Sequence, residues 1–424
     1  MIKVRKTTNN ARKCSWTRKS HHLKTPQRPR PVRTVMTRSQ CTSAAGFFNG
    51  LPAEVFHMIL DQMSVVDISV FSMVSKELTS CVVSYISSQA WRNKTIIQSF
   101  HNPTLLEQRS TLEHYRHLGL LFKRCTLLLP TKDRLKFIFS KFSQCFTPDC
   151  TGFSRYGVLL QTLIAGWDEL ECHRVFCFLC EQTNLLLKTE ALLTTKPGRY
   201  QELQLRLFCR KVLLDPCQNQ PDGQFWLVQL LKPWPLVSQA HLLFILFGPL
   251  LHEGEVTFRH ALWDLAKCIL MLSGTLQVKG WSTDSVLSIL EELIVIPQPW
   301  YLENVARLLV LCGSSLCYTF LASKALNGRL DEISRVIIHI ILVCEKDGYH
   351  MSWAVKLVQQ ICKVFSTAPE RKKLQHVLKA FKNVNNNSLS PGNNFEDRET
   401  FQTFCILLDS SARFHTKLLH MFLK

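Results

Sequence analysis

The densest group of side chains that could do chemistry lies between residues 172 and 180 of this 424-residue chain. It contains Cys172, His173, Cys177 and Cys180, and the last two form a C-x-x-C pair. Thiolates and imidazoles are ligands that zinc prefers, but a zinc site needs four of them converging on the metal. The stretch instead predicts one continuous helix in which the cysteines lie among Phe and Leu. We therefore interpret them as buried structural cysteines, and we predict neither a metal nor a cofactor.

Three carboxylates just upstream, Asp168, Glu169 and Glu171, are the next candidates, because clustered carboxylates can perform acid–base catalysis. Asp168 followed three residues later by Glu171 is also the pattern of a capping box at the start of a helix, and an apolar run follows it. The sequence contains no G-x-S-x-G, phosphate-binding loop, H-E-x-x-H or G-x-G-x-x-G motif. We therefore expect a protein that is not itself an enzyme.

The composition is typical of a chain that folds, because hydrophobic residues make up 46% of it and charged residues only 20%. The formal net charge of +19 is unevenly distributed. Residues 1–50 hold 12 of the 51 Lys and Arg and no acidic residue. The other positions carry the remaining 39 basic residues against 32 acidic ones, so they are only mildly basic.

Residues 1–46 mix Lys and Arg with Pro, Ser and Thr and show no sustained apolar period, which predicts a disordered basic tail. Two other roles stay open for this tail. One is nuclear import or contact with nucleic acid, for which clustered positive charge is the signal. The other is a mitochondrial transit peptide, which the prolines between residues 26 and 31 disfavour because they interrupt an amphipathic helix.

The 17 cysteines are spread through apolar helical stretches, and no secretory signal precedes them. This distribution favours a reduced, intracellular compartment: the nucleus, the cytoplasm or both. The longest weakly charged apolar stretch, Leu236–Leu251, contains several polar residues and the pair Gly248-Pro249. We interpret it as a buried helix that stops at that pair, and we expect no membrane span.

Residues 47–92 form the most informative segment. Pro52 at a first helical position predicts that a helix starts after Leu51, and apolar residues then recur at helical spacing. Ser64 and Ser75 predict N-caps for a second and a third helix. Three short helices in so short a segment cannot bury all their apolar surface, so we expect a partner to cover part of it.

This segment resembles the F-box family in the order and spacing of its motif. The matching features are Leu-Pro-x-Glu at 51–54, Ile-Leu at 59–60, Asp-Ile at 67–68, Val-Ser-Lys at 74–76 and a late Trp at 91. In that family the Leu-Pro start and the apolar stripes contact the Skp adaptor, which is tethered to a cullin carrying a RING subunit. Carried over by position, the candidate adaptor contacts are Leu51, Pro52, Val55, Ile59, Leu60, Met63, Ile68, Val74 and Leu78.

One departure from the family pattern is Leu78, where many F-boxes have Trp, and this change weakens the expected adaptor contact. The alternative interpretation makes residues 47–92 simply the first three helices of a larger helical domain, with the same apolar residues in its core.

Residues 105–424 predict an all-helical substrate-recognition body with an Asn-rich loop at 383–394. Apolar runs with helical spacing alternate with Gly and Pro stop signals, and Thr131 after Pro130 predicts one N-cap. No leucine-rich, WD or kelch period is present. The fold class expected is therefore all-α: a three-helix F-box followed by a helical stack, for which a HEAT-like solenoid is one possible form.

Five segments of the body resemble one particular type of F-box protein rather than the family at large. They are 113–136, 165–175, 231–235, 301–309 and 362–367. With the F-box, this closer resemblance spans about 50 to 370 and fades toward both ends.

The resemblance implies the substrate-recognition subunit of a Skp-cullin-F-box ubiquitin ligase. Its partners would be the Skp adaptor, a cullin and a RING subunit reached through that adaptor, and a protein substrate whose binding residues are unknown. Such a receptor needs no catalytic residue, because it acts by holding the substrate near a charged ubiquitin carrier. The alternatives are a helical scaffold that uses the adaptor for stability and a nucleic-acid-associated protein acting through its basic tail. Nucleic acid is the less favoured partner, and no membrane partner is expected.

Overall fold

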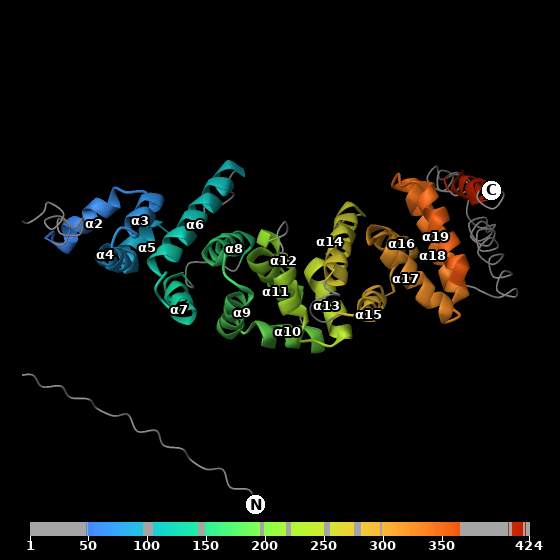
Figure 1. The fold of residues 1–424 in the computed structure, drawn as a ribbon, viewed down its shortest axis with the longest axis horizontal. Coiled ribbons are helices and arrows are strands. Elements are labelled where there is room, and N and C mark those ends of the chain that lie inside the picture. The colour runs from blue at the N-terminus through green and yellow to red at the C-terminus, as the bar shows by residue number, and fades with distance from the viewer. Residues whose placement is uncertain are drawn as a thin grey trace, which may run out of the picture. The chain divides into compact units, whose positions relative to one another are not determined.

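The computed structural model describes residues 48, 50–95, 105–142, 149–195, 199–217, 222–249, 255–274, 281–296, 299–364, 406, 409–418 and 420. Within these ranges every regular element is a helix, as Figure 1 shows. The predicted all-α fold class is therefore confirmed. The predicted basic tail at 1–46 and the predicted Asn-rich loop at 383–394 lie outside the described residues.

The N-terminal helices correspond to the segment that resembles an F-box. They are α2 (Ala53–Asp61), α3 (Val65–Phe71), α4 (Lys76–Ser87) and α5 (Gln89–Thr95). The Ser64 hydroxyl accepts a hydrogen bond from the backbone N–H of Asp67, and the Ser75 hydroxyl accepts one from Leu78, both at 3.2 Å. Both predicted N-caps are therefore confirmed. Pro52 is the N-cap of α2 rather than its first helical residue, because its ψ of 147° is extended.

Besides a helical segment at 409–418, the described part of the body contains fourteen α-helices, one π-helix and one 3-10 helix. These are α6 (Leu105–Cys125), α7 (Thr131–Phe142), α8 (Cys150–Ile164), α9 (Glu169–Thr183), α10 (Leu185–Thr194), α11 (Arg199–Phe208), the π-helical η2 (Cys209–Leu214), the 3-10 helical η3 (Asp215–Cys217), α12 (Asp222–Leu231), α13 (Leu236–Phe247), α14 (Glu255–Gly274), α15 (Thr283–Leu293), α16 (Leu302–Leu311), α17 (Gly313–Leu326), α18 (Leu330–Lys346) and α19 (Met351–Val364).

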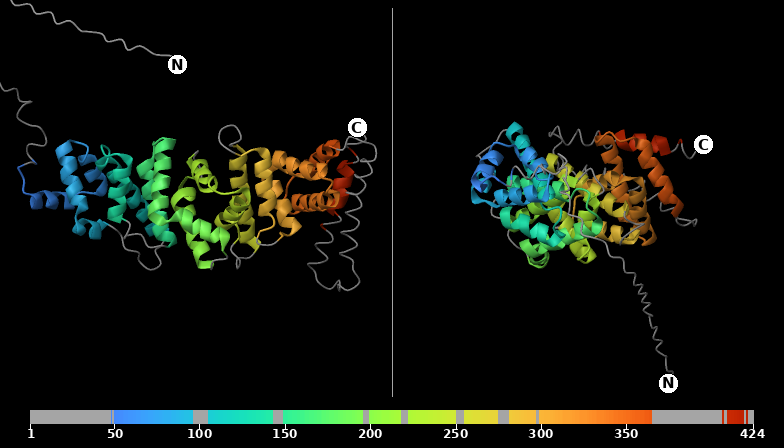
Figure 2. Two further views of the ribbon diagram at one scale, coloured as in Figure 1. Left: turned by 90° about the horizontal axis from the view of Figure 1, so that it is seen from below. Right: turned by 60° about the vertical axis from the view of Figure 1, so that its left-hand side comes forward.

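Helices two positions apart in the chain make the most extensive contacts in the body. α6 packs on α8, α13 on α15, α14 on α16, α16 on α18 and α17 on α19. In Figure 2, helices close in colour, and therefore close in sequence, lie side by side. Because each helix contacts mainly its near neighbours in sequence, the arrangement is that of a helical solenoid. None of the helices in the described ranges is both long and apolar enough to cross a lipid bilayer.

Two of the helix boundaries predicted from local signals are confirmed. The stretch that begins at Leu236 is the buried helix α13, and Gly248 is its C-cap, donating its N–H to the Phe244 carbonyl at 2.7 Å. Asp168 is the N-cap of α9, and its carboxylate accepts the backbone N–H of Glu171 at 2.7 Å. Both signals depend on residues within four positions of one another, so tertiary packing did not need to be known.

The predicted cap at Thr131 is wrong. Thr131 is the first residue of α7, and the Pro130 carbonyl before it accepts the N–H of Arg134 at 2.9 Å. The Thr131 hydroxyl instead donates a short hydrogen bond to the Glu171 carboxylate of α9. A partner 40 residues away in sequence therefore competes successfully with the local capping bond.

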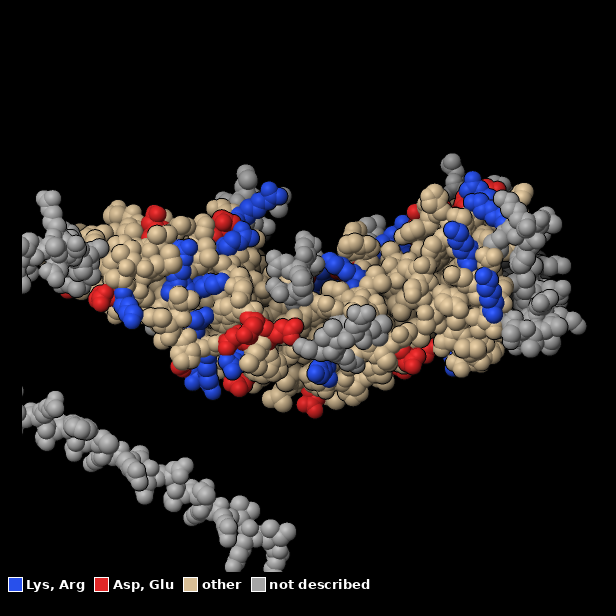
Figure 3. All heavy atoms as spheres, in the orientation of Figure 1, with Lys and Arg blue, Asp and Glu red and all other residues tan. Residues whose placement is uncertain are grey.

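The charged groups on the side of the molecule seen in Figure 3 are mixed in sign over most of the described helices. This agrees with the small excess of basic residues outside the first 50 positions. Charge of one sign is therefore not the feature that distinguishes a binding surface on this side.

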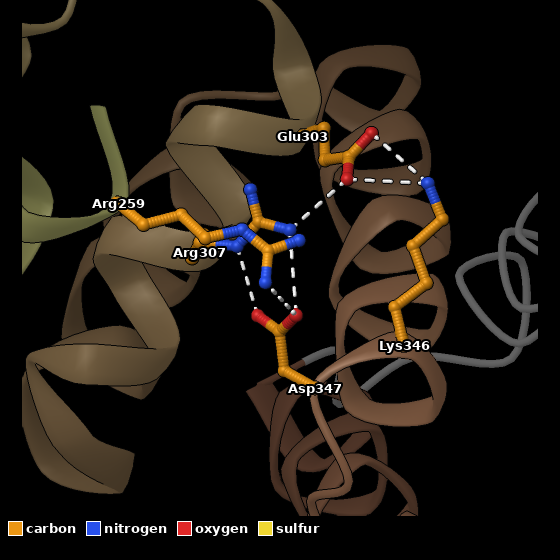
Figure 4. Close-up of polar contacts among 5 residues, drawn as sticks. All are labelled: Arg259, Glu303, Arg307, Lys346 and Asp347. Atoms are coloured by element: carbon orange, nitrogen blue, oxygen red, sulfur yellow. Dashed lines mark hydrogen bonds and ion pairs between the residues drawn. The ribbon is translucent and has the colours of Figure 1, made fainter. Parts of the chain in front are cut away.

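A buried cation joins three of the C-terminal helices. Arg307 of α16 is 5% exposed, and its Nε donates to Asp347 Oδ2 at 2.8 Å while its Nη2 donates to Glu303 Oε1 at 3.1 Å. Figure 4 shows Asp347 facing both Arg307 and Arg259, whose Nη1 lies 3.6 Å from Asp347 Oδ1, and Lys346 facing Glu303. The network ties α14 and α16 to the C-terminal end of α18.

The electrostatic balance at Arg307 favours the charged form. Burial by itself lowers the pKa of Arg307, but the hydrogen bond and charge of Asp347, together with Glu303, outweigh burial and raise this pKa. The guanidinium therefore stays protonated and neutralises two carboxylates at a helix junction.

We expect Arg307→Met to lower the free energy of unfolding by roughly 3 kcal/mol, because it leaves the mostly buried Asp347 carboxylate without its main partner. A guanidinium chloride titration of the full chain measures this change. Arg329→Met is the matched control: Arg329 is 61% exposed and its Nη1 lies 3.8 Å from Glu332, so we expect less than about 1 kcal/mol. Equal losses for the two variants would contradict a stabilising role for the buried network.

Candidate functional site

An exposed apolar surface extends over the first two described helices and the turn after α3. Its side chains and their exposed fractions are Val55 41%, Met58 68%, Ile59 37%, Val66 37%, Val70 49%, Met73 55% and Val74 55%. We call these seven residues the F-box face. In Figure 3 the surface over α2–α5 is largely uncharged on the side in view. A cluster of exposed aliphatic side chains on so small a unit is the usual sign of a protein-binding surface.

A second set of apolar residues from the same helices forms their core. Leu60 is fully buried, Leu78 is 1% exposed and Ile68 is 2% exposed. Trp91 of α5 is also buried, at 3% exposure, and its ring packs edge-on against Tyr85 at a centroid distance of 6.2 Å. One stripe of each helix is therefore committed to internal packing, and a different stripe remains at the surface.

The nine adaptor contacts predicted from the sequence fall into three groups in the structure. Pro52, Val55, Ile59 and Val74 are exposed, Leu51 and Met63 are half-buried, and Leu60, Ile68 and Leu78 are in the core. No partner is present, so the contacts themselves stay predictions. Direct contact through the three core residues would require the helices to rearrange.

Sequence reasoning missed four members of the F-box face. Met58, Val66, Val70 and Met73 are exposed, although none was singled out in the sequence. Val66, Val70 and Met73 recur at intervals of four and three, the spacing of one helix face, so the signal was present. Both the exposed and the buried stripes are apolar, however, and helical spacing alone does not tell which of them faces the core.

Polar contacts link the end of α2 to α4 and α5. The Tyr85 hydroxyl donates to Asp61 Oδ1 at 2.8 Å, and Lys94 Nζ donates to the same oxygen at 3.2 Å. The hydrogen bonds from Tyr85 and Lys94 lower the pKa of Asp61, and burial together with Asp61 raises the pKa of Tyr85. These contacts join the C-terminal end of α2 to α4 and α5.

The F-box helices are also joined to the body through α6. Arg124 Nη1 donates to the Ser69 hydroxyl of α3 at 2.6 Å. Burial raises the pKa of the neighbouring Cys125 thiol to about 11, partly offset by a hydrogen bond with the Ser72 side chain. The F-box helices and α6 thus form one packed unit.

The thiol cluster of α9 does not form a metal site in the structure. Cys172, Cys177 and Cys180 lie along one helix with His173, whose Nδ1 contacts Gln229 Oε1 at 2.9 Å. Within the part of the chain that is described, no three His, Cys, Asp or Glu side chains are grouped closely enough to hold a metal ion. Burial raises the pKa of Cys180 to about 12. The predicted burial is wrong for Cys177, which is exposed because it shares the outward side of α9 with His173, and Cys172 and Cys180 are only half-buried.

Two family models match the chain. The F-box domain model matches residues 48–87, and the model described as FBXO47, ARM repeats matches residues 181–258 and 256–423. The curated F-box only protein 47 of Mus musculus is 47% identical over 416 residues, and that of Homo sapiens is 46% identical over 417 residues. Each of these matches covers 92% of this chain and 92% of the relative. No solved structure matches the chain significantly.

The match over α2–α4, together with the exposed apolar face on these helices, defines the chain as an F-box protein. The repeats of its helical solenoid are matched as ARM repeats, so the predicted solenoid is confirmed with that repeat type rather than the HEAT type. The identity and coverage of the curated relatives show that the chain belongs to the F-box only protein 47 family. The closer resemblance inferred from the body segments is therefore confirmed. The matched region reaches residue 423, beyond the expected limit near 370.

The division of the F-box helices into a core and an exposed face can be tested by substitution. We expect Leu60→Ala to lower the free energy of unfolding by about 3 kcal/mol, because it leaves a cavity at a fully buried position. Met58→Ala, at a side chain that is 68% exposed, should change it by less than about 0.5 kcal/mol. Urea titration of the full chain, with amide hydrogen exchange of peptides covering 53–95, measures both effects. A large loss for Met58→Ala would mean that the face is packed rather than free.

Proposed function

We propose that this protein is the substrate-receptor subunit of a Skp-cullin-F-box ubiquitin ligase, and that its F-box face binds the Skp adaptor. The observation that carries the proposal is the F-box face itself: seven aliphatic side chains left at the surface of a small helical unit. In this proposal residues 47–92 form the F-box and residues 105–424 form the body that recognises the substrate.

The adaptor interface in this proposal combines exposed residues with a supporting core. The residues in contact are the F-box face with Leu51, Pro52 and Met63, while Leu60, Ile68 and Leu78 act from beneath by fixing the positions of the helices. Covering exposed aliphatic carbon contributes about 25 cal/mol per Å² removed from water, so such a face is a strong source of binding energy. Leu78 is a core residue here. The replacement of the Trp found in many F-boxes by Leu therefore affects internal packing directly and adaptor binding only indirectly.

The receptor role requires no catalytic chemistry from this chain. The F-box tethers the body to the adaptor, and the adaptor tethers it to a cullin and its RING subunit. A substrate held by the body then meets the ubiquitin carrier at a high effective concentration, which accelerates transfer without any acid, base or nucleophile from the receptor.

The adaptor contact is tested by placing charges on the F-box face. We expect the double variant Val70→Glu, Met73→Glu to lower the affinity for the purified Skp adaptor by at least about a hundredfold, because it places unpaired carboxylates in an apolar interface. The variant should keep the stability of the wild type, because the two side chains are 49% and 55% exposed. Isothermal titration calorimetry with the full chain measures the affinity.

Val237→Glu is the matched control for this experiment, since Val237 is a 56% exposed valine of α13, far along the chain from the F-box. We expect it to bind the adaptor like the wild type. Recovery of a cullin together with the adaptor in a pull-down of the wild type supports the ligase role. A wild type that does not bind the adaptor contradicts the proposal, and a wild type that binds the adaptor but never a cullin favours the scaffold role.

A further inference from the structure

A second apolar surface lies in the loop between α6 and α7. Three consecutive leucines of this loop are exposed: Leu127 by 64%, Leu128 by 77% and Leu129 by 42%. Single exposed leucines are ordinary on protein surfaces, but three in succession place a continuous apolar patch in solvent. These side chains point outward, so packing in the core of the described chain does not explain why they are leucines.

The backbone of this loop is held in place by a buried arginine. Arg134 is 8% exposed, and its Nε donates to the Thr126 carbonyl at 3.0 Å. Its Nη2 donates to the carbonyl of Leu127 at 3.0 Å and to that of Leu129 at 3.4 Å. The guanidinium also lies 4.7 Å from the centre of the Trp167 ring. The carbonyls are thus satisfied from inside while the leucine side chains are presented outward.

These hydrogen bonds give the loop an ordered backbone. Leu129 donates its N–H to the Thr126 carbonyl at 3.0 Å, which closes the turn and fixes it further. A loop that is already ordered loses little conformational entropy when it binds, so its apolar side chains contribute more of their burial energy to affinity. Exposed, fixed leucines are suited to an apolar protein partner.

The loop emerges beside the F-box face. Arg124 and Cys125, the last residues of α6, contact Ser69 and Ser72 at α3 and the turn that follows it. Met73 and Val74 of the F-box face directly follow Ser72 in the chain, and the loop with its three leucines directly follows Cys125. Both exposed apolar segments therefore start from the same contact between the end of α6 and the turn after α3.

We propose that Leu127, Leu128 and Leu129 extend the F-box face into one continuous surface, and that the Skp adaptor covers both parts. This inference rests on the proposed adaptor binding and deepens it. The shared starting point of the two apolar segments, at the contact of Cys125 with Ser72, and the fixed backbone of the loop favour one partner over two. Anchoring on the body as well as on the F-box fixes the orientation of the body relative to the adaptor, which a contact through the F-box alone leaves less constrained.

The test is the affinity of the full chain for the purified Skp adaptor, measured by isothermal titration calorimetry. We expect the double variant Leu127→Ser, Leu128→Ser to weaken binding by about tenfold or more, since each leucine loses a contact worth a large part of its burial energy. Leu326→Ser is the matched control, because Leu326 has the same 77% exposure as Leu128 but lies at the end of α17. It should bind like the wild type. Both variants replace exposed side chains, so both should fold normally.

The outcomes separate this inference from the proposed function. If Leu127→Ser, Leu128→Ser binds the adaptor as tightly as the wild type while Val70→Glu, Met73→Glu does not bind, the inference is overturned and the proposed function stands. Equal weakening by Leu326→Ser also overturns it. If the wild type itself does not bind the adaptor, the proposed function is contradicted, and the inference that rests on it is contradicted as well. Light scattering provides a further check: a dimer that the leucine variant alone disrupts, with unchanged adaptor affinity, assigns the loop to a second copy of the chain instead.

Discussion

The structure depends on a limit of size: four short helices have more apolar surface than they can bury among themselves. α2–α5 respond by dividing their apolar residues among three uses. Leu60 and Leu78 build an internal core, α3 packs against α6, and Val70 with its neighbours remains in solvent. The body therefore begins as the packing partner of the F-box, and the unburied remainder becomes the surface available for binding.

Further along the chain, buried ion pairs connect helices that apolar packing alone would leave free to slide. Arg210 of η2 contacts Asp215 at 3.0 Å and Asp264 of α14 at 2.9 Å. Burial raises the pKa of Asp215, but Arg210 and Lys211 outweigh it and keep this pKa below its ordinary value. Buried pairs of this kind add little net stability over an apolar contact, but a wrong register leaves a charge unpaired. In a stack of similar amphipathic helices, the penalty for an unpaired charge favours one position of each helix along its neighbour.

The sequence was sufficient where the deciding interaction was local. Ser64, Ser75 and Asp168 cap helices through groups three residues away, and Gly248 ends a helix one turn after Phe244, so each boundary could be predicted from its own neighbourhood. The predictions failed where a distant partner decided the outcome. The hydroxyl of Thr131 bonds to α9, and whether Leu60 or Met58 faces the core depends on where α4 and α5 pack. A single sequence shows both apolar stripes of a helix, but it does not show which of them faces the core.

The role of α6 limits how this F-box protein could be divided into interchangeable modules. The Trp91 ring of α5 packs edge-on against Phe122 of α6 at a centroid distance of 6.4 Å, and both side chains are buried. A fragment that stopped at the end of α5 would expose these rings and the α6-facing side of α3 to water. A graft of this F-box unit onto a foreign domain should therefore include α6 and place the fusion joint beyond Cys125.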